Sequence, residues 1–132
     1  MKKRSNCPIS YLLDIVGDKW SLLIVRDLMF KGKCFYREFL ESEEGMATNI
    51  LADRLKRLEE EKIIVSKPYP ENRTRKVYTL TKKGKDLLPI LLEIIAWSGT
   101  YDRKSGATKE YVHRICNDRE KLMAEVLDNL SE

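Results

Sequence analysis

The sequence has few of the residues that build metal centres or disulfide frameworks. It contains one histidine and three cysteines, Cys7, Cys34 and Cys116, and no two cysteines form a CxxC pair. An odd number of widely spaced cysteines argues against a closed disulfide framework. Only His113 and Cys116 lie close enough to share a metal ion, and a structural site generally needs four ligands. We therefore expect reduced thiols, no metal and no cofactor.

Signatures of catalysis and of membrane insertion are equally scarce. No glycine-rich phosphate loop is present, and the one histidine lies in a different predicted helix from Cys7 and Cys34, so no Cys-His pair is supported. The basic segment 1–6 precedes an apolar run that Asp14 and Asp18 interrupt, which argues against a signal peptide or a membrane span. We predict a cytoplasmic protein that is not an enzyme and has no membrane partner.

Length and composition predict one globular domain. The chain has 132 residues, of which 42% are hydrophobic and 35% charged, too apolar for a disordered chain and too short for two ordinary domains.

Positive charge is concentrated in one segment. Residues 62–85 carry 8 basic and 1 acidic side chains, whereas residues 1–61 carry 11 of each and residues 86–132 carry 6 basic and 9 acidic. Cations gathered on one face release counterions from a nucleic acid. A solvated Lys/Arg face is the other interpretation of the charge alone.

Apolar residues at helical spacing predict four helices in the first half of the chain. Gly17 ends the first, and Asp18 is placed to cap the second. The predicted helices cover about residues 9–16, 20–29, 36–40 and 47–61.

The period then changes from helix to strand. Residues 63–65 and 77–80 are rich in β-branched and aromatic side chains, and the turn-like segment 71–74 between them predicts a hairpin with a basic tip. Two further helices are expected over about residues 82–101, kinked near Lys85 by Pro89, and 108–130.

A helical triad followed by a hairpin predicts a winged helix-turn-helix, a mainly α fold with a small β-hairpin wing. We assign residues 8–81 to a DNA-binding core and 82–132 to a helical dimerisation region. The third helix of the triad, 47–61, is then the recognition helix that enters the major groove.

The recognition helix has polar residues suited to DNA. Thr48 and Asn49 can bond base edges or phosphates, Asp53 can accept from a cytosine amino group, and Lys56 and Arg57 can meet phosphates. A merely solvated helix face is the competing interpretation.

The chain resembles the HxlR-type regulators, relatives of the MarR-type winged helices. The resemblance covers about residues 7–97. The matching segments are Cys7-Pro8, Gly17-Asp18-Lys19-Trp20, Phe35-Tyr36-Arg37-Glu38-Phe39, Asn49-Ile50-Leu51-Ala52-Asp53-Arg54-Leu55, Leu58-Glu59 before Ile63-Ile64, and Tyr78-Thr79-Leu80-Thr81-Lys82-Lys83-Gly84.

The resemblance implies a homodimer built by the first and last helices, which accounts for the apolar character of residues 87–97. It also implies that Arg54 and the wing residues, including Arg75, contact phosphates and that Arg73 can enter the minor groove. The family often has a basic residue or threonine where Cys34 stands here, so one phosphate contact is not expected. The candidate interface residues are Leu91, Ile94, Ile95 and Trp97.

Cys7 is a candidate redox-sensing thiol. It lies at the start of the first helix, whose unpaired N–H groups favour a thiolate, and Lys2, Lys3 and Arg4 add positive charge nearby. The resemblance adds that a cysteine at this place senses oxidants in several members of the family. A helix-start residue packed at the dimer interface is the alternative.

These features predict a sequence-specific regulator that binds an inverted-repeat DNA operator as a homodimer. The alternative is a winged-helix module that binds protein rather than DNA. The basic bias of residues 62–85 discriminates between them in favour of double-stranded DNA.

Overall fold

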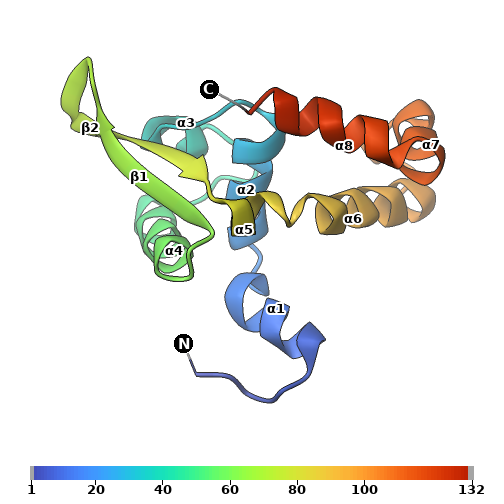
Figure 1. Cartoon of the computed structure of the whole chain (residues 1–132), viewed down its shortest axis with the longest axis horizontal. Coiled ribbons are helices and arrows are strands. Elements are labelled where there is room, and N and C mark those ends of the chain that lie inside the picture. Colours follow the sequence, from blue (N-terminus) through green and yellow to red (C-terminus); the bar gives the residue numbers. More distant parts are fainter. Residues whose placement is uncertain (1, 131–132) are drawn as a thin grey trace. The chain divides into compact units, whose positions relative to one another are not determined.

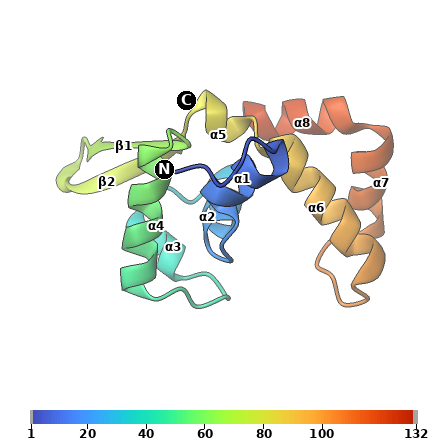
Figure 2. The same ribbon diagram turned by 90° about the horizontal axis from the view of Figure 1, so that it is seen from below.

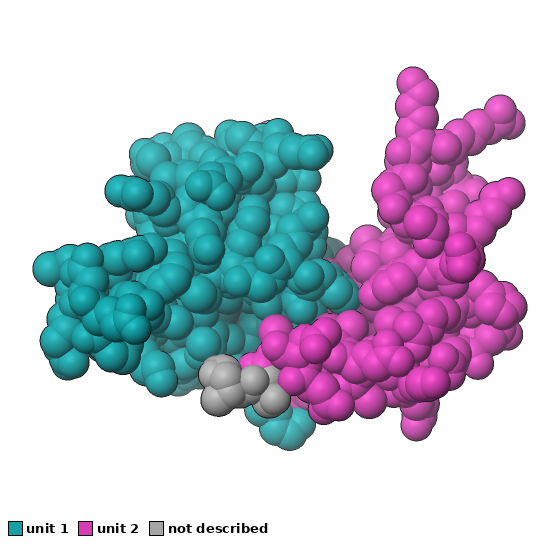
Figure 3. All heavy atoms as spheres, turned by 90° about the horizontal axis from the view of Figure 1, so that it is seen from above, with its two compact units in different colours: residues 1–84 teal, residues 85–132 magenta. Residues whose placement is uncertain are grey.

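The computed structural model describes residues 2–130, which form two compact units, residues up to Gly84 and residues from Lys85 (Figure 3). Its elements follow the predicted order of four helices, a hairpin and further helices (Figure 1). Unit 1 contains α1 (Pro8–Val16), α2 (Ser21–Phe30), α3 (Tyr36–Leu40), α4 (Thr48–Glu60), β1 (Ile64–Tyr69), β2 (Asn72–Leu80) and most of α5 (Lys82–Lys85).

The boundaries in unit 1 follow local signals in the sequence. Pro8 occupies the first turn of α1, and Gly17 ends it. The Asp18 carboxylate accepts hydrogen bonds from the backbone N–H groups of Trp20 and Ser21, and so caps the start of α2 as predicted. The Thr81 hydroxyl accepts from the Gly84 N–H at the start of α5 in the same way.

The two strands pair antiparallel and form the wing. Ile64 lies opposite Leu80 at the base, and a register shift between Pro68 and Tyr69 brings Tyr69 opposite Asn72. The buried side chains of Ile64, Tyr78 and Leu80 lie near the base, whereas residues 70–76 are exposed. Figures 1 and 2 show the hairpin reaching past α4, so its turn lies away from the helices of unit 1.

Apolar side chains from every major element of unit 1 are buried. In α4 they come from the face that the periodicity predicted, and Phe39 and Leu51 are fully enclosed. In α1, however, Ile9 and Leu13 are exposed and only Ile15 and Val16 are buried. The buried set is Ile15, Val16, Ile24, Val25, Leu28, Met29, Phe39, Met46, Leu51, Leu55, Leu58, Ile63, Ile64, Tyr78 and Leu80.

Unit 2 contains three helices: α6 (Leu88–Tyr101), α7 (Lys109–Asn117) and α8 (Arg119–Asp128). Helix α6 packs along α7, and a glycine permits their close approach, because a Cβ at Gly99 would lie 2.7 Å from Cγ2 of Val112. The side chains of Ile115 and Leu122 are buried.

Two predicted long helices are each divided in two. The expected helix over residues 82–101 breaks after Lys85, and Pro89 lies in the first turn of α6 instead of kinking a continuous helix. The expected helix over 108–130 was wrong as a single element, because Asp118 adopts φ −142° and ψ 38°. Asn and Asp side chains compete with helical hydrogen bonding, and the Asn117 amide donates to the His113 carbonyl at this break.

No helix in residues 2–130 is both long and apolar enough to cross a membrane.

Candidate nucleic-acid interface

Helix α4 separates an apolar face from a polar face. Leu51, Leu55 and Leu58 are buried. Four polar residues that the sequence predicted to face DNA are exposed. They are Thr48, Asn49, Asp53 and Lys56.

Arg54 has a second role within the protein. Its Nε donates to Oδ2 of Asp18 at 2.8 Å, and its Nη1 donates to Oδ2 of Asp53 at 2.5 Å. The Arg54 and Asp18 side chains are 18% and 20% exposed, so this ion pair is largely shielded from solvent. It links α4 to the start of α2.

Asp18 is held in its ionised form by this arrangement. Burial acts to raise the pKa of its carboxyl group, but hydrogen bonds from the Ser21 hydroxyl, the Arg54 guanidinium and two backbone N–H groups outweigh burial and lower the pKa to about 2. The same carboxylate therefore caps α2 and anchors α4.

The wing presents two cations without ion-pair partners among the described residues. Arg73 and Lys76 are exposed and make no ion pair with any residue between 2 and 130. The Asn72 side-chain oxygen accepts from the Thr74 hydroxyl at 2.7 Å and fixes the start of β2.

Arg75 is exposed but stacked. Its guanidinium lies 3.9 Å from the centre of the Phe35 ring, and the Phe35 and Tyr69 rings meet edge to face at 5.0 Å. The Cys34 carbonyl accepts from the Tyr78 N–H at 2.8 Å, which fastens the segment before α3 to β2. Arg75 thus braces the wing against residues 34–35.

Cys34 lies beside this cluster. It is partly buried, and burial, followed by the neighbouring Glu38 carboxylate, raises the pKa of its thiol. Cys116, on α7, is exposed.

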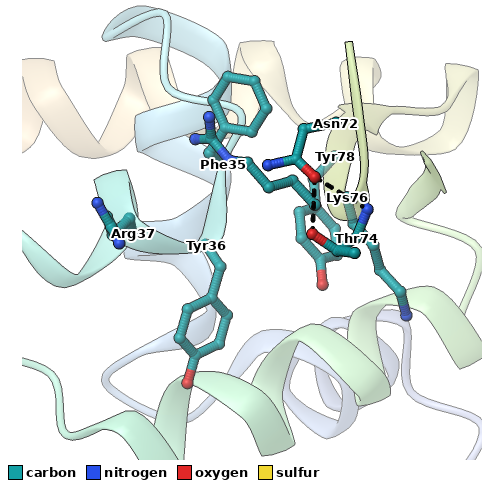
Figure 4. A pocket seen from close by; sticks show the side chains of 8 residues that line it. Phe35, Tyr36, Arg37, Asn72, Thr74, Lys76 and Tyr78 are labelled. Atoms are coloured by element: carbon teal, nitrogen blue, oxygen red, sulfur yellow. Dashed lines mark hydrogen bonds between the residues drawn. The ribbon is translucent and has the colours of Figure 1, made fainter. Parts of the chain in front are cut away.

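An open pocket of about 690 Å³ lies between the start of α3 and β2. Three cationic side chains line it, Arg37, Arg75 and Lys76, together with the polar side chains of Asn72 and Thr74, and no acidic residue does. Figure 4 shows the Asn72 and Thr74 side chains on one wall and Arg37 and Tyr36 on the other. Arg37 was not among the DNA-binding residues expected from the sequence, because α3 carries no local signal for such a role. Lys76 was covered only by the general expectation for the basic residues of the wing.

Cys7 is exposed at the N-cap of α1. Of the three basic residues predicted to lie near it, Arg4 is paired within the protein, because its guanidinium donates to the Asp14 carboxylate at 2.5 Å. The structure therefore places an accessible thiol at a helix start.

Helix α6 exposes an apolar stripe. Ile94 and Trp97 are 42% and 68% exposed, whereas Leu91 is only 6% exposed and lies inside the protein rather than on this stripe. Ile90 and Tyr101 are also exposed and share the face, since positions 90, 94, 97 and 101 repeat at helical spacing. Ile95, by contrast, is partly buried and points elsewhere around the helix.

Ile90 and Tyr101 were not among the expected interface residues, because that prediction rested on the apolar content of the helix and not on its separate faces. Helix α1 has exposed apolar residues of its own, Ile9 and Leu13.

Several known proteins are similar to this chain in sequence and in fold. The HTH-type transcriptional regulator sll1512 of Synechocystis is 38% identical over 65% of this chain and 63% of its own length, so the match spans just under two thirds of that relative. The reduced form of the transcriptional regulator YodB from Bacillus subtilis superposes with a TM-score of 0.60 at 30% identity, over 75% of this chain and 97% of YodB. The redox regulator HypR in its oxidised form superposes with a TM-score of 0.61 at 32% identity, over 71% of this chain and 96% of HypR.

These neighbours confirm the winged helix-turn-helix fold. The family model described as HxlR-like helix-turn-helix matches residues 15–105, which span α2, α3, α4, the wing and α6. The protein therefore belongs to the HxlR-like helix-turn-helix family.

Proposed function

We propose that the protein is a transcriptional regulator that binds double-stranded DNA, with α4 in the major groove and the wing at the adjacent minor groove. The observation that carries this proposal is the pairing of an exposed polar face on α4 with a wing whose Arg73 and Lys76 have no ion-pair partner among residues 2–130. Unpaired cations can neutralise DNA phosphates, and the exposed polar side chains of the helix can form hydrogen bonds with base edges.

Individual residues have separate roles in this proposal. Thr48, Asn49 and Asp53 contact base edges, and Lys56 contacts a phosphate. Arg54 anchors α4 through Asp18, and its Nη2, which has no hydrogen-bond partner among the described residues, remains available for a phosphate. Arg73 enters the minor groove, and Arg75 supports the wing.

The protein acts as a homodimer through the apolar stripe of α6 and the exposed side chains of α1. A soluble chain is stabilised by covering such surfaces, and a two-fold dimer covers each with its own copy. Two recognition helices about 34 Å apart then select an inverted repeat with half-sites about one helical turn apart.

Selection from a random double-stranded DNA library tests the proposal. The purified protein is expected to retain an inverted repeat, with salt-dependent affinity. Asn49→Ala is expected to relax the preference at one position, whereas Lys56→Ala weakens binding to all sequences alike. Failure to retain any duplex, with salt-independent elution from heparin, would instead favour a module that binds protein.

Cys7 gives the regulator a redox response. Its side chain is exposed at the start of α1, and the similar protein HypR is a redox regulator by name. A hydroperoxide transfers one oxygen atom to the Cys7 thiolate, giving a sulfenic acid and an alcohol or water; the Cys7 thiol of the partner subunit then displaces water to form a disulfide. Linking two α1 helices changes the spacing of the recognition helices.

The test compares operator affinity before and after mild peroxide in wild type, Cys7→Ser and Cys116→Ser. Cys116 is the matched control, because it is also exposed. We expect the response to disappear only in Cys7→Ser. Equal affinity of the reduced and oxidised wild-type protein, or a response that survives in Cys7→Ser, would remove Cys7 as the sensor.

A further inference from the structure

The pocket between α3 and β2 has a lining suited to a polyanion. It combines Arg37 and Lys76, neither of which has an ion-pair partner among residues 2–130, with the side-chain amide of Asn72. The oxygen of that amide accepts from Thr74, so its nitrogen is left to donate, and Figure 4 shows it pointing toward the space between the walls.

We propose that this pocket receives the sugar-phosphate strand that separates the two DNA grooves, an inference that rests on the proposed function. In a winged-helix complex the recognition helix occupies the major groove and the wing touches the backbone or the neighbouring minor groove. The strand between these grooves must pass between the start of the recognition helix and the wing.

The walls of the pocket belong to the required elements. On one side, the Tyr36 hydroxyl donates at 3.0 Å to the carbonyl of Thr48, the first residue of α4, so this wall is fixed to the start of the recognition helix. On the other side, Asn72, Thr74 and Lys76 belong to β2 of the wing.

The stacked Arg75 keeps the pocket open. Its guanidinium carbon lies 3.9 Å from the centre of the Phe35 ring, and the backbone hydrogen bond from the Tyr78 N–H to the Cys34 carbonyl ties the two walls together. Arg75 is therefore held by the fold before DNA arrives, which lowers the ordering cost of binding at this side chain.

The double variant Arg37→Ala/Lys76→Ala tests the pocket. Its affinity for the DNA duplex that the wild-type protein selects is measured by titration at several potassium chloride concentrations. Two lost phosphate contacts are expected to lower the slope of log affinity against log salt by about two. Affinity is expected to fall about tenfold per side chain, for selected and scrambled duplexes alike.

Arg103→Ala/Lys104→Ala is the matched control, because it removes one arginine and one lysine that are also exposed and that lie between α6 and α7. Arg37→Lys/Lys76→Arg keeps both charges and is expected to retain most of the slope. Circular dichroism melting checks that all three variants fold, as expected for exposed positions.

Ethylation interference locates the contact. Ethylating phosphates between the major-groove half-site and the minor groove at the wing is expected to block wild-type binding but to have no further effect on the double variant. A double variant that matches the Arg103/Lys104 control in slope and interference pattern would overturn the pocket proposal and leave DNA binding intact. A wild-type protein that binds no duplex would overturn the proposed function as well.

Discussion

The wing and helix α6 expose surfaces of opposite character. Residues 72–76 of β2 are all exposed and include three cations, whereas α6 exposes Ile90, Ile94, Trp97 and Tyr101 along one face. An exposed cationic surface binds favourably mainly to an anionic partner. An exposed apolar stripe is stabilised by burial against another apolar surface. One protein thus presents one surface suited to DNA and another suited to a second copy of itself.

One ion pair in each unit shows how their exposure to solvent differs. Arg54 and Asp18 in unit 1 are shielded, whereas Arg114 and Glu125 in unit 2 have side chains that are 33% and 49% exposed. Solvent and salt screen exposed pairs, which then contribute little to stability. We therefore expect substitutions to affect the two units through different interactions.

The largest effect is expected from Trp97→Glu. A carboxylate placed in an apolar interface loses its hydration without gaining a partner, at a cost of about 3 kcal/mol, which weakens dimerisation by more than about 100-fold. Sedimentation velocity at micromolar concentration is expected to show a monomer, and operator affinity falls with it.

Ala124→Glu is the control, since it adds the same charge at an exposed position of α8. It is expected to leave the dimer intact. Dimerisation of Trp97→Glu with wild-type affinity would show that the α6 stripe is not the interface.

A smaller effect is expected from Asp18→Asn in unit 1. The pKa of Asp18 is about 2 in the folded protein and near 3.8 when unfolded, so its charged form stabilises the fold by on the order of 2 kcal/mol. This contribution is complete above about pH 4 and is lost as the pH falls toward 2. The variant is expected to be less stable than wild type at pH 7, with the difference disappearing in acid.

Asp53→Asn serves as the comparison in the same urea titrations. Its carboxylate also accepts from Arg54 but is 54% exposed, so the substitution is expected to change the free energy of unfolding by less than about 0.5 kcal/mol. Equal destabilisation by the two variants at pH 7 would contradict the role given to Asp18. So would a stability difference between wild type and Asp18→Asn that stays undiminished as the pH falls through 2.

Arg73→Ala is expected to affect DNA binding and not folding. Its side chain is exposed, and its loss removes one phosphate or minor-groove contact. The salt slope is expected to fall by about one, at unchanged melting temperature. If Arg73→Ala and Arg103→Ala behave alike in titrations with the selected duplex, Arg73 lies outside the interface.

The smallest effect is expected from Arg114→Ala in unit 2. Its contacts with Glu125 and Asp118 are exposed, so the melting temperature of the variant is expected to equal that of wild type within experimental error. Any remaining difference is expected to vanish at 0.5 M salt, where charges are screened over a length on the order of 4 Å. A large, salt-resistant loss of stability would mean that exposed ion pairs hold unit 2 together.

The elements of unit 1 were predictable because their signals are local. The leucine stripe of α4, the Asp18 cap and the strand pattern on either side of the turn each act within a few residues, and the structure confirms all three. The break at Asp118 was missed because no proline or glycine marks it. Helix propensity alone did not separate α7 from α8.

The sequence by itself determined the order of the elements, the location of the positive charge and the apolar character of residues 88–101, because periodicity and composition are read along the chain. Only the tertiary structure decided which cations are engaged and which are free. Arg54 is paired with Asp18, 36 residues away, and Arg75 is stacked on Phe35, while Arg37 and Lys76 face one pocket from separate elements. Partners so distant along the chain meet only when the chain folds. The sequence cannot distinguish these roles, because an arginine carries the same charge whether its guanidinium is paired within the protein or is free to bind a phosphate.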